Sequence, residues 1–182
     1  VSAQRTSTTG GPVPNGGWIL SMEKQDKVLW VDGLRARVQG GVILGQFQGE
    51  LANQGLVFPP DPTSRHECTI GAAIACNASG AKSFRYGPTR PWIEALQVVL
   101  PDGSIHEITR QDPIPEDWPR IDWQPPKIKT AAGYFPADNL LDLFIGQEGT
   151  LGVITEATLR LIPAPESTFS ILSFFSSLES CL

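Results

Sequence analysis

The 182-residue chain gathers many of its glycines into three clusters, each flanked by small polar side chains. Glycine lets the backbone approach a ligand closely, and successive backbone N–H groups can enclose an anion without a cationic side chain. A pyrophosphate group suits such loops, although a tight turn explains any single cluster as well. The sequence therefore predicts a phosphate-binding site built from loops that contain Gly10 and Gly11, Gly71 to Gly87, and Gly146, Gly149 and Gly152.

Neither of two common nucleotide-binding motifs accounts for these glycines. The run GQEGTLG at 146–152 has the spacing GxxGxxG, whereas a Rossmann fingerprint needs GxGxxG between a strand and a helix. In SGAKS at 79–83 the glycine and the lysine are not adjacent, as a P-loop requires. The spacing argues against a Rossmann NAD site and against Walker-type ATP binding.

Few side chains could carry hydrolytic or metal chemistry. The two histidines, His66 and His106, lie in a polar loop and after a turn, and neither is close to a GxSxG or HExxH motif. Cys68, Cys76 and Cys181 are odd in number and lack CxxC spacing, which fits neither a disulfide framework nor a zinc site. We therefore expect surface histidines, reduced thiols in the core or in strands, and no metal.

Glu148 is the acidic side chain that stands inside the third glycine cluster. Its sequence neighbours include Phe144, Ile145, Leu151 and Val153, which are apolar. A partly buried, hydrogen-bonded carboxylate is one interpretation of this pattern, and a cap or turn carboxylate is the other.

Charge and hydropathy exclude several classes of protein. Fourteen Lys and Arg against nineteen Asp and Glu give a net charge of -5, and the basic residues are dispersed, so we expect no nucleic-acid partner. The apolar runs are too short to span a membrane, and the hydrophobic content of 41% argues against disorder. The start of the sequence has neither a charged n-region nor an apolar h-region, so we expect no signal peptide. With the odd, scattered cysteines, a cytoplasmic protein is expected, and peripheral membrane attachment stays an open alternative.

Short apolar runs between turn residues predict several strands. One strand is expected at 18–22, and a hairpin at 28–31 and 36–38 turns through Asp32 and Gly33. A second hairpin is expected at 95–100 and 105–108, and a later strand at 153–162 carries Ala157, Leu159 and Leu161 on one face.

Helical periodicity is confined to short segments. Leu44, Phe47 and Leu51 predict a helix within 41–55 that ends at Gly55, and Asp138 is expected to cap a helical turn that reaches Phe144. The proline-rich run at 111–126 is expected to be an irregular loop. Many short strands with few short helices favour an α+β fold, with a mixed or antiparallel sheet and flanking short helices.

Four ordered blocks of this sequence resemble the FAD-binding domain of the FAD-linked oxidases, the PCMH or vanillyl-alcohol-oxidase type of flavoprotein. The resemblance covers residues 1–165 and is strongest to the D-lactate and glycolate dehydrogenase branch. The blocks are RTSTTGGPVPNGGWILSMEK, FPPDPTSRHECTIGAAIACNASGAKSFRYGPTRPWI, LQVVLPDGSI and KTAAGYFPADNLLDLFIGQEGTLGVITEATLRLIPAP.

The resemblance implies which residues bind the cofactor FAD. The first loop would wrap the pyrophosphate through its backbone amides, and the residues concerned are Thr6, Ser7, Thr8, Thr9, Gly10 and Gly11. The second block would line the flavin and ribityl region with Pro60, Asp61, Thr69, Ile70 and Gly71, followed by Asn77, Gly80, Tyr86 and Gly87. The adenosine half would lie near Glu148, Gly149, Gly152 and the backbone of Ile154.

The sequence departs from the family pattern at three points. Ala72 replaces the second glycine of the family's TIGG motif, which adds a methyl group near the cofactor. No histidine occupies the first loop, so FAD is expected to be non-covalent. The family's first αβ subdomain and its C-terminal cap domain are expected to be missing, so that 1–165 is a truncated FAD-binding domain and 166–182 is the start of the cap, with its first strand.

The function implied by the resemblance is oxidation of a 2-hydroxy acid, such as D-lactate or glycolate, by hydride transfer to flavin N5. A quinone, a cytochrome or an electron-transfer flavoprotein would reoxidise the flavin. No residue can be named as the catalytic base, and the isolated chain is expected to be inactive. Two alternatives stay open: a flavin reductase like UDP-N-acetylenolpyruvoylglucosamine reductase, and a non-catalytic glycine-rich binding module.

Overall fold

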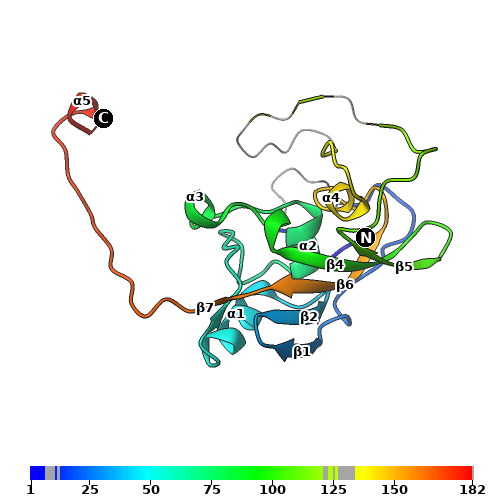
Figure 1. Ribbon diagram of the computed structural model, residues 1–182, viewed down its shortest axis with the longest axis horizontal. Coiled ribbons are helices and arrows are strands. Elements are labelled where there is room, and N and C mark those ends of the chain that lie inside the picture. The colour runs from blue at the N-terminus through cyan, green and yellow to red at the C-terminus, as the bar shows by residue number, and fades with distance from the viewer. Residues whose placement is uncertain (7–10, 12, 121–122, 125, 127–133, 182) are drawn as a thin grey trace.

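A computed structural model of the chain describes residues 1–6, 11, 13–120, 123–124, 126 and 134–181 (Figure 1). Within them, one five-stranded sheet has the order β1-β2-β6-β4-β5, and all neighbouring strands are antiparallel. The strands are β1 (Val28–Asp32), β2 (Arg35–Gln39), β4 (Ile93–Val99), β5 (Ile105–Thr109) and β6 (Val153–Arg160). The two predicted hairpins are confirmed, and the late strand β6 joins them at the centre of the sheet.

Short elements surround this sheet. A two-stranded sheet pairs β3 (Leu56–Val57) with β7 (Ile162–Pro163). The helices are α1 (Leu44–Ala52), α2 (Ile70–Ala75), α3 (Ser83–Tyr86), α4 (Leu140–Phe144) and α5 (Leu178–Cys181), with a 3₁₀ helix, η1 (Arg90–Trp92). Figure 1 shows α2 beside β6, and α4 close to β4 and β5. None of the described helices is long and apolar enough to cross a membrane.

The hydrophobic core joins the buried side chains of the sheet to those of α1, α2 and α4, and the buried face of α1 is the one that its periodicity predicts. Leu44, Phe47 and Leu51 of α1 are fully buried, and the ring of Phe47 packs 6.4 Å, centroid to centroid, from that of Phe58. Ala157 lies on the central strand β6 and pairs in register with residues of both β2 and β4. Its small side chain is fully buried. The core fixes the sheet on which the loops of the candidate site rest.

The strand predicted at 18–22 is wrong. Trp18 is fully exposed, and Ser21 forms only an isolated bridge to Ser2. The run is apolar, but its backbone hydrogen-bonds only locally, to Ser2 and from the Met22 carbonyl to Gln25, and Met22 carries its one buried side chain.

The cap predicted at Asp138 is also wrong. Asn139 is the N-cap of α4, because its side-chain oxygen accepts a hydrogen bond from the Asp142 N–H at 2.9 Å. A carboxylate and an amide oxygen can both cap a helix, so the composition of the segment does not distinguish the two positions.

The caps of α4 allow a direct test. Replacing Asn139 by alanine removes the bond to the Asp142 N–H, and we expect the free energy of unfolding to fall by about 0.5–2 kcal/mol. Asp138→Ala is the matched control, since Asp138 is exposed, and its effect should stay within about 0.5 kcal/mol. Urea denaturation of both variants checks this, and an equal loss in the two would contradict the assignment of the cap.

The C-terminal segment is not the strand that was expected. Residues 166–177 form no helix or strand, and α5 follows as a single helical turn. Figure 1 shows this segment leading away from the rest of the molecule. Its large apolar side chains, Phe169 and Phe174 among them, are exposed because they have no sheet to join. The domain boundary at residue 165 stays a prediction.

Candidate functional site

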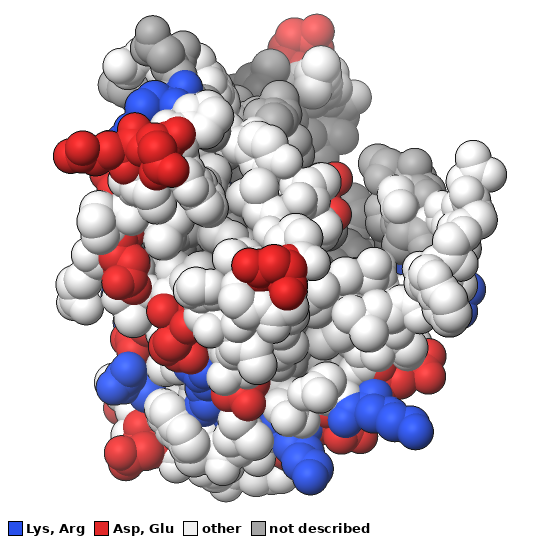
Figure 2. All heavy atoms as spheres, turned by 90° about the vertical axis from the view of Figure 1, so that its right-hand side faces the viewer, with Lys and Arg blue, Asp and Glu red and all other residues white. Residues whose placement is uncertain are grey.

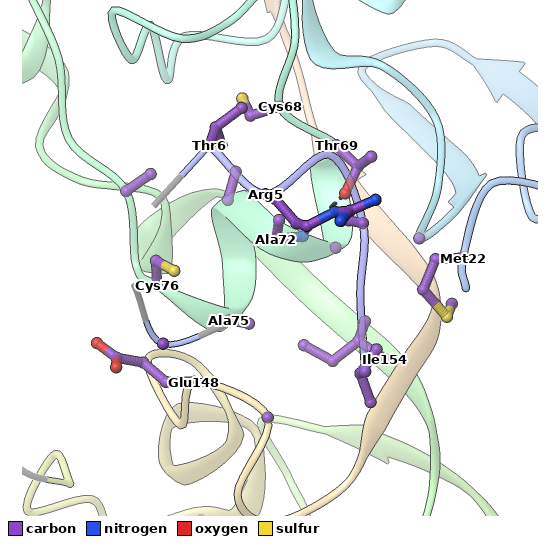
Figure 3. Close-up of a pocket in the computed structure, with 18 of the residues that line it drawn as sticks. Arg5, Thr6, Met22, Cys68, Thr69, Ala72, Ala75, Cys76, Glu148 and Ile154 are labelled. Carbon is purple, nitrogen blue, oxygen red and sulfur yellow. Dashed lines mark hydrogen bonds between the residues drawn. The ribbon is translucent and has the colours of Figure 1, made fainter. Parts of the chain in front are cut away.

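A cleft of about 600 Å³ lies where the N-terminal segment, α2 and the loop 146–152 meet (Figure 3). Of the 23 described residues that line it, ten are glycine or alanine: Ala3, Gly11, Gly40, Gly71, Ala72, Ala73, Ala75, Ala78, Gly149 and Gly152. The volume is in the range of small-molecule and cofactor sites. Small side chains leave the backbone as much of the surface that a ligand would contact.

One wall of the cleft is α2, which packs closely on the chain at Gly40. The Gly71 N–H donates to the Gly40 carbonyl at 2.8 Å, and a Cβ on Gly71 would lie only 2.7 Å from that oxygen. The Thr69 side chain caps the helix by accepting from the Ala72 N–H. The N–H groups of residues 70–73 thus all have protein acceptors, so the predicted amide nest is not formed there, and α2 offers a surface instead.

The second wall is the loop 146–152, which a buried glutamine organises. Gln147 is 2% exposed, and its amide accepts from the Leu151 N–H at 2.8 Å and donates to the Gly152 carbonyl at 3.0 Å. Two hydrogen bonds join the loop to α2: Gly146 N–H to the Ile74 carbonyl and Glu148 N–H to the Ala75 carbonyl.

Of the two interpretations of Glu148, the partly buried carboxylate is wrong, because its side chain is exposed, and the turn carboxylate is confirmed, because Glu148 lies in a turn with φ at 54°. Glu148 lies at the end of α2 opposite Thr69, and its carboxylate points outward (Figure 3). A neutral amide both donates and accepts, so Gln147 can be buried at less cost than an unpaired carboxylate.

Left-handed backbone gathers around the cleft. Within the described part of the chain, three non-glycine residues have positive φ: Arg5 at 53°, Asn77 at 44° and Glu148 at 54°. Arg5 and Glu148 line the cleft, and Asn77 lies between the lining residues Cys76 and Ala78. Such conformations are uncommon and concentrate at functional sites.

The structure brings together eight of the residues predicted to hold FAD. Those that line the cleft are Thr6, Gly11, Thr69, Gly71, Glu148, Gly149, Gly152 and Ile154. Those that lie outside its lining are Pro60, Asp61, Ile70, Asn77, Gly80, Tyr86 and Gly87. Ser7, Thr8, Thr9 and Gly10 fall outside the described residues.

Several residues outside the lining hold neighbouring backbone in place. The Asp61 carboxylate pairs with Arg65 at 2.8 Å and with Lys82 at 3.4 Å. A Cβ on Gly80 would overlap the Asp61 carbonyl, so glycine is required for this close approach. The side chain of Ile70 is buried in the core, and that of Tyr86 packs on Trp92. These residues support the loops that lead to the cleft.

Sequence reasoning missed a larger set of lining residues, including Arg5, Gly40, Cys68, Cys76 and Gln147. The small-residue run around α2 was a usable signal for its alanines and for the flanking cysteines. Gly40 and Gln147 gave no comparable signal, because their roles depend on partners distant in sequence or on burial. Burial raises the pKa of the Cys68 thiol, so this thiol stays protonated and is a poor nucleophile.

Other chemistries find little support in the described residues. No group of three or more His, Cys, Asp or Glu among them could hold a metal ion. His66 and His106 are both exposed, as expected, and hydrogen-bond to Arg65 and Ser104. On the face shown in Figure 2, Lys and Arg side chains stand among Asp and Glu side chains and form no basic stripe.

Comparison with known proteins is consistent with this geometry. A family model described as "FAD binding domain" matches residues 1–109. The chain is 38% identical to "D-lactate dehydrogenase" of Anaerostipes hadrus, over 100% of this chain and 34% of the relative. It is 34% identical to "Glycolate oxidase subunit GlcD" of Bacillus subtilis (strain 168), over 96% of this chain and 34% of the relative.

A solved structure has the same architecture. "Alkyldihydroxyacetonephosphate synthase" superposes with a TM-score of 0.67 at 25% sequence identity, covering 91% of this chain and 29% of that one. The chain spans about a third of the length of the curated relatives that it matches. The family model, the curated relatives and the solved structure agree with the sequence blocks and with the α+β fold. This chain therefore belongs to the FAD binding domain family, with a PCMH-type fold and FAD as its cofactor.

Proposed function

We propose that this chain is the FAD-binding part of a dehydrogenase that oxidises a 2-hydroxy acid such as D-lactate or glycolate. The observation that carries the proposal is the small-residue cleft at the junction of three sequence blocks. The relatives' names support the substrate class: they include D-lactate dehydrogenase, glycolate oxidase subunit GlcD and, at 36% identity, the D-2-hydroxyglutarate dehydrogenase of Xanthomonas citri pv. viticola.

The cleft lining fits an extended dinucleotide. Gly149 faces open space, since a Cβ there would meet no described atom within 4 Å. Arg5 is the cationic side chain of the described lining, and it lies across the start of α2 (Figure 3). A guanidinium can pair with a phosphate through two parallel hydrogen bonds. The methyl group of Ala72, where the family motif has glycine, also lines the cleft and narrows it.

The residues proposed to hold FAD are those of the predicted set that reach the cleft, together with Arg5. Thr6, Gly11 and Arg5 would contact the phosphates, and Glu148, Gly149, Gly152 and Ile154 would lie along the adenosine half. Thr69 and Gly71 present the edge of α2. No histidine stands among the described lining residues, which supports non-covalent binding.

Bound FAD supplies the hydride acceptor, and the protein supplies position and environment. The apolar lining, for example Met22 and Ile154, excludes water from one side of the cleft. A quinone, a cytochrome or an electron-transfer flavoprotein is the proposed electron acceptor. A cytoplasmic location, with peripheral membrane attachment as the alternative, belongs to the proposal as well and is supported by the odd, scattered cysteines.

Flavin binding and reduction test the two halves of this proposal. The purified chain should quench the fluorescence of added FAD and carry flavin absorbance through gel filtration. In the longest protein that contains this chain, anaerobic D-lactate, glycolate or D-2-hydroxyglutarate should bleach the flavin. A chain that takes up no FAD would overturn the cofactor assignment. If the protein takes up FAD but no hydroxy acid bleaches the flavin, the substrate class is rejected and the non-catalytic binding module remains as the interpretation.

A further inference from the structure

Arg90 is a buried arginine whose side chain binds backbone. It belongs to η1, its side chain is 13% exposed, and its guanidinium donates to the carbonyls of Asp142 and Ile145. Both carbonyls lie at the C-terminal end of α4, where an α-helix leaves its carbonyl groups without intrahelical partners. Arg90 therefore caps the C-terminal end of α4, where the loop 146–152 begins.

The guanidinium is held in place by a ring and a carboxylate. It stacks on Phe135, 4.0 Å from the ring centroid, and lies 3.4 Å from the Asp142 carboxylate. Arg110 binds the same carboxylate at 2.9 Å and donates to the Arg90 carbonyl at 2.8 Å. Side chain and backbone of Arg90 are thus both fixed.

The backbone of Arg90 also faces α2. Its N–H donates at 2.9 Å to the side chain of Asn77, the buried left-handed residue that follows α2. A Cβ on Gly146 would lie 3.5 Å from both the Arg90 Nη2 atom and the Asn77 Cβ, so Gly146 fits between them. Gly146 N–H donates a hydrogen bond to the Ile74 carbonyl, and Glu148 N–H donates one to the Ala75 carbonyl. These two bonds attach the loop 146–152 to α2.

Arg37 shows how a different buried arginine is used. Its side chain is 10% exposed, but its partners are the carboxylates of Glu107 and Glu156 across the sheet. The hydrogen bond to Glu107 is the main cause that raises the pKa of Arg37, whereas burial lowers the pKa of Arg90 against the opposing effect of Asp142. The buried guanidinium of Arg90 exchanges its water contacts mainly for hydrogen bonds to two main-chain carbonyls. Such bonds suit a residue that fixes backbone geometry.

We propose that Arg90 is a positioning residue for FAD: by binding the carbonyls of Asp142 and Ile145 it holds the loop 146–152 against α2 and so shapes the cleft. This inference rests on the proposed function for the identity of the ligand. The geometric part, that Arg90 fixes the loop, concerns the protein alone. A lysine would keep the charge but could not span both carbonyls with a planar, forked donor.

The test compares Arg90→Met and Arg90→Lys with the matched control Arg37→Met. Amide exchange by NMR, without FAD, should become about tenfold faster or more at Gly146 and Glu148 in both Arg90 variants and stay near wild type in the control. Affinity for FAD should fall about 10- to 100-fold in both, the range seen when residues that orient metal ligands are lost. Arg37→Met should change FAD affinity less than about threefold, even where its melting temperature falls as far.

Each other outcome rejects a stated part. If amide exchange and FAD affinity are the same in the Arg90 and Arg37 variants, Arg90 contributes only to overall stability, and the inference is overturned. Full FAD affinity in Arg90→Lys, with loss in Arg90→Met, would assign the effect to charge and also overturn it. If Arg90→Met does not fold, Arg90→Gln with the same readouts replaces it. A wild-type chain that binds no FAD rejects the proposed function, and the exchange data then decide the loop-fixing role alone.

Discussion

Gly149→Val should weaken FAD binding while the core of the chain remains folded. Gly149 lines the cleft with φ at 83°, and a Cβ there meets no described atom, so the added methyl groups enter space that the ligand needs. Overfilling a fitted site costs about 1–3 kcal/mol, which weakens binding about 5- to 150-fold. Titration of the chain with FAD, followed by flavin fluorescence, measures the loss.

The strain of valine at a positive φ needs its own control, and Gly103 provides it. Gly103 lies in the β4–β5 turn with φ at 84°, and a Cβ there also meets no described atom within 4 Å. Valine in left-handed backbone should lower the free energy of unfolding by about 1–2 kcal/mol in both variants. Only Gly149→Val should lose FAD. Equal FAD affinity in the two variants would remove the loop 146–152 from the binding site.

Phe47→Ala should cost about 3–5 kcal/mol of unfolding free energy, the usual loss for a large aromatic side chain in a core. Phe47 is fully buried, and its ring packs on Phe58. A single domain has about 5–15 kcal/mol in total, so this variant should be close to unfolding at room temperature. Urea denaturation followed by the fluorescence of the five tryptophans gives the value.

Phe84→Ala is the matched control for the core. Phe84 lies on α3 and is completely exposed, so its removal creates no cavity and should change stability by less than about 0.5 kcal/mol. A loss of similar size in Phe47→Ala and Phe84→Ala would show that α1 does not form the core described above.

Local sequence patterns correctly predicted the two hairpins, whose strands hydrogen-bond to each other, and α1, which buries one apolar face. The turns at Gly33 and Gly103 have positive φ, and both hairpins formed as expected. The apolar spacing of Leu44, Phe47 and Leu51 predicted α1. The run at 18–22 failed because apolar character alone does not supply a pairing strand, and the cap of α4 was misplaced by one residue because neighbouring Asp and Asn are equivalent candidates.

The candidate site was predicted in part. The glycine clusters and the family resemblance pointed to the N-terminal loop, the α2 region and the loop 146–152, and all three contribute residues to the cleft. At the start of the second cluster the expected nest of amides does not form, since the N–H groups of residues 70–73 all bind protein acceptors and that of Gly71 binds Gly40. A glycine needed for close packing and a glycine needed for ligand contact look the same in sequence.

The sequence by itself determined the kind of protein: its patterns predicted small-residue loops on an α+β core, and four ordered blocks resemble those of an FAD-binding domain. Only the tertiary structure decided which groups face the cleft. It buried Gln147 and exposed Glu148, and it brought Gly40 to α2 and Arg90 to the end of α4. The reason is that these contacts join residues about 30 to 55 positions apart or depend on burial, which local propensity and spacing do not encode.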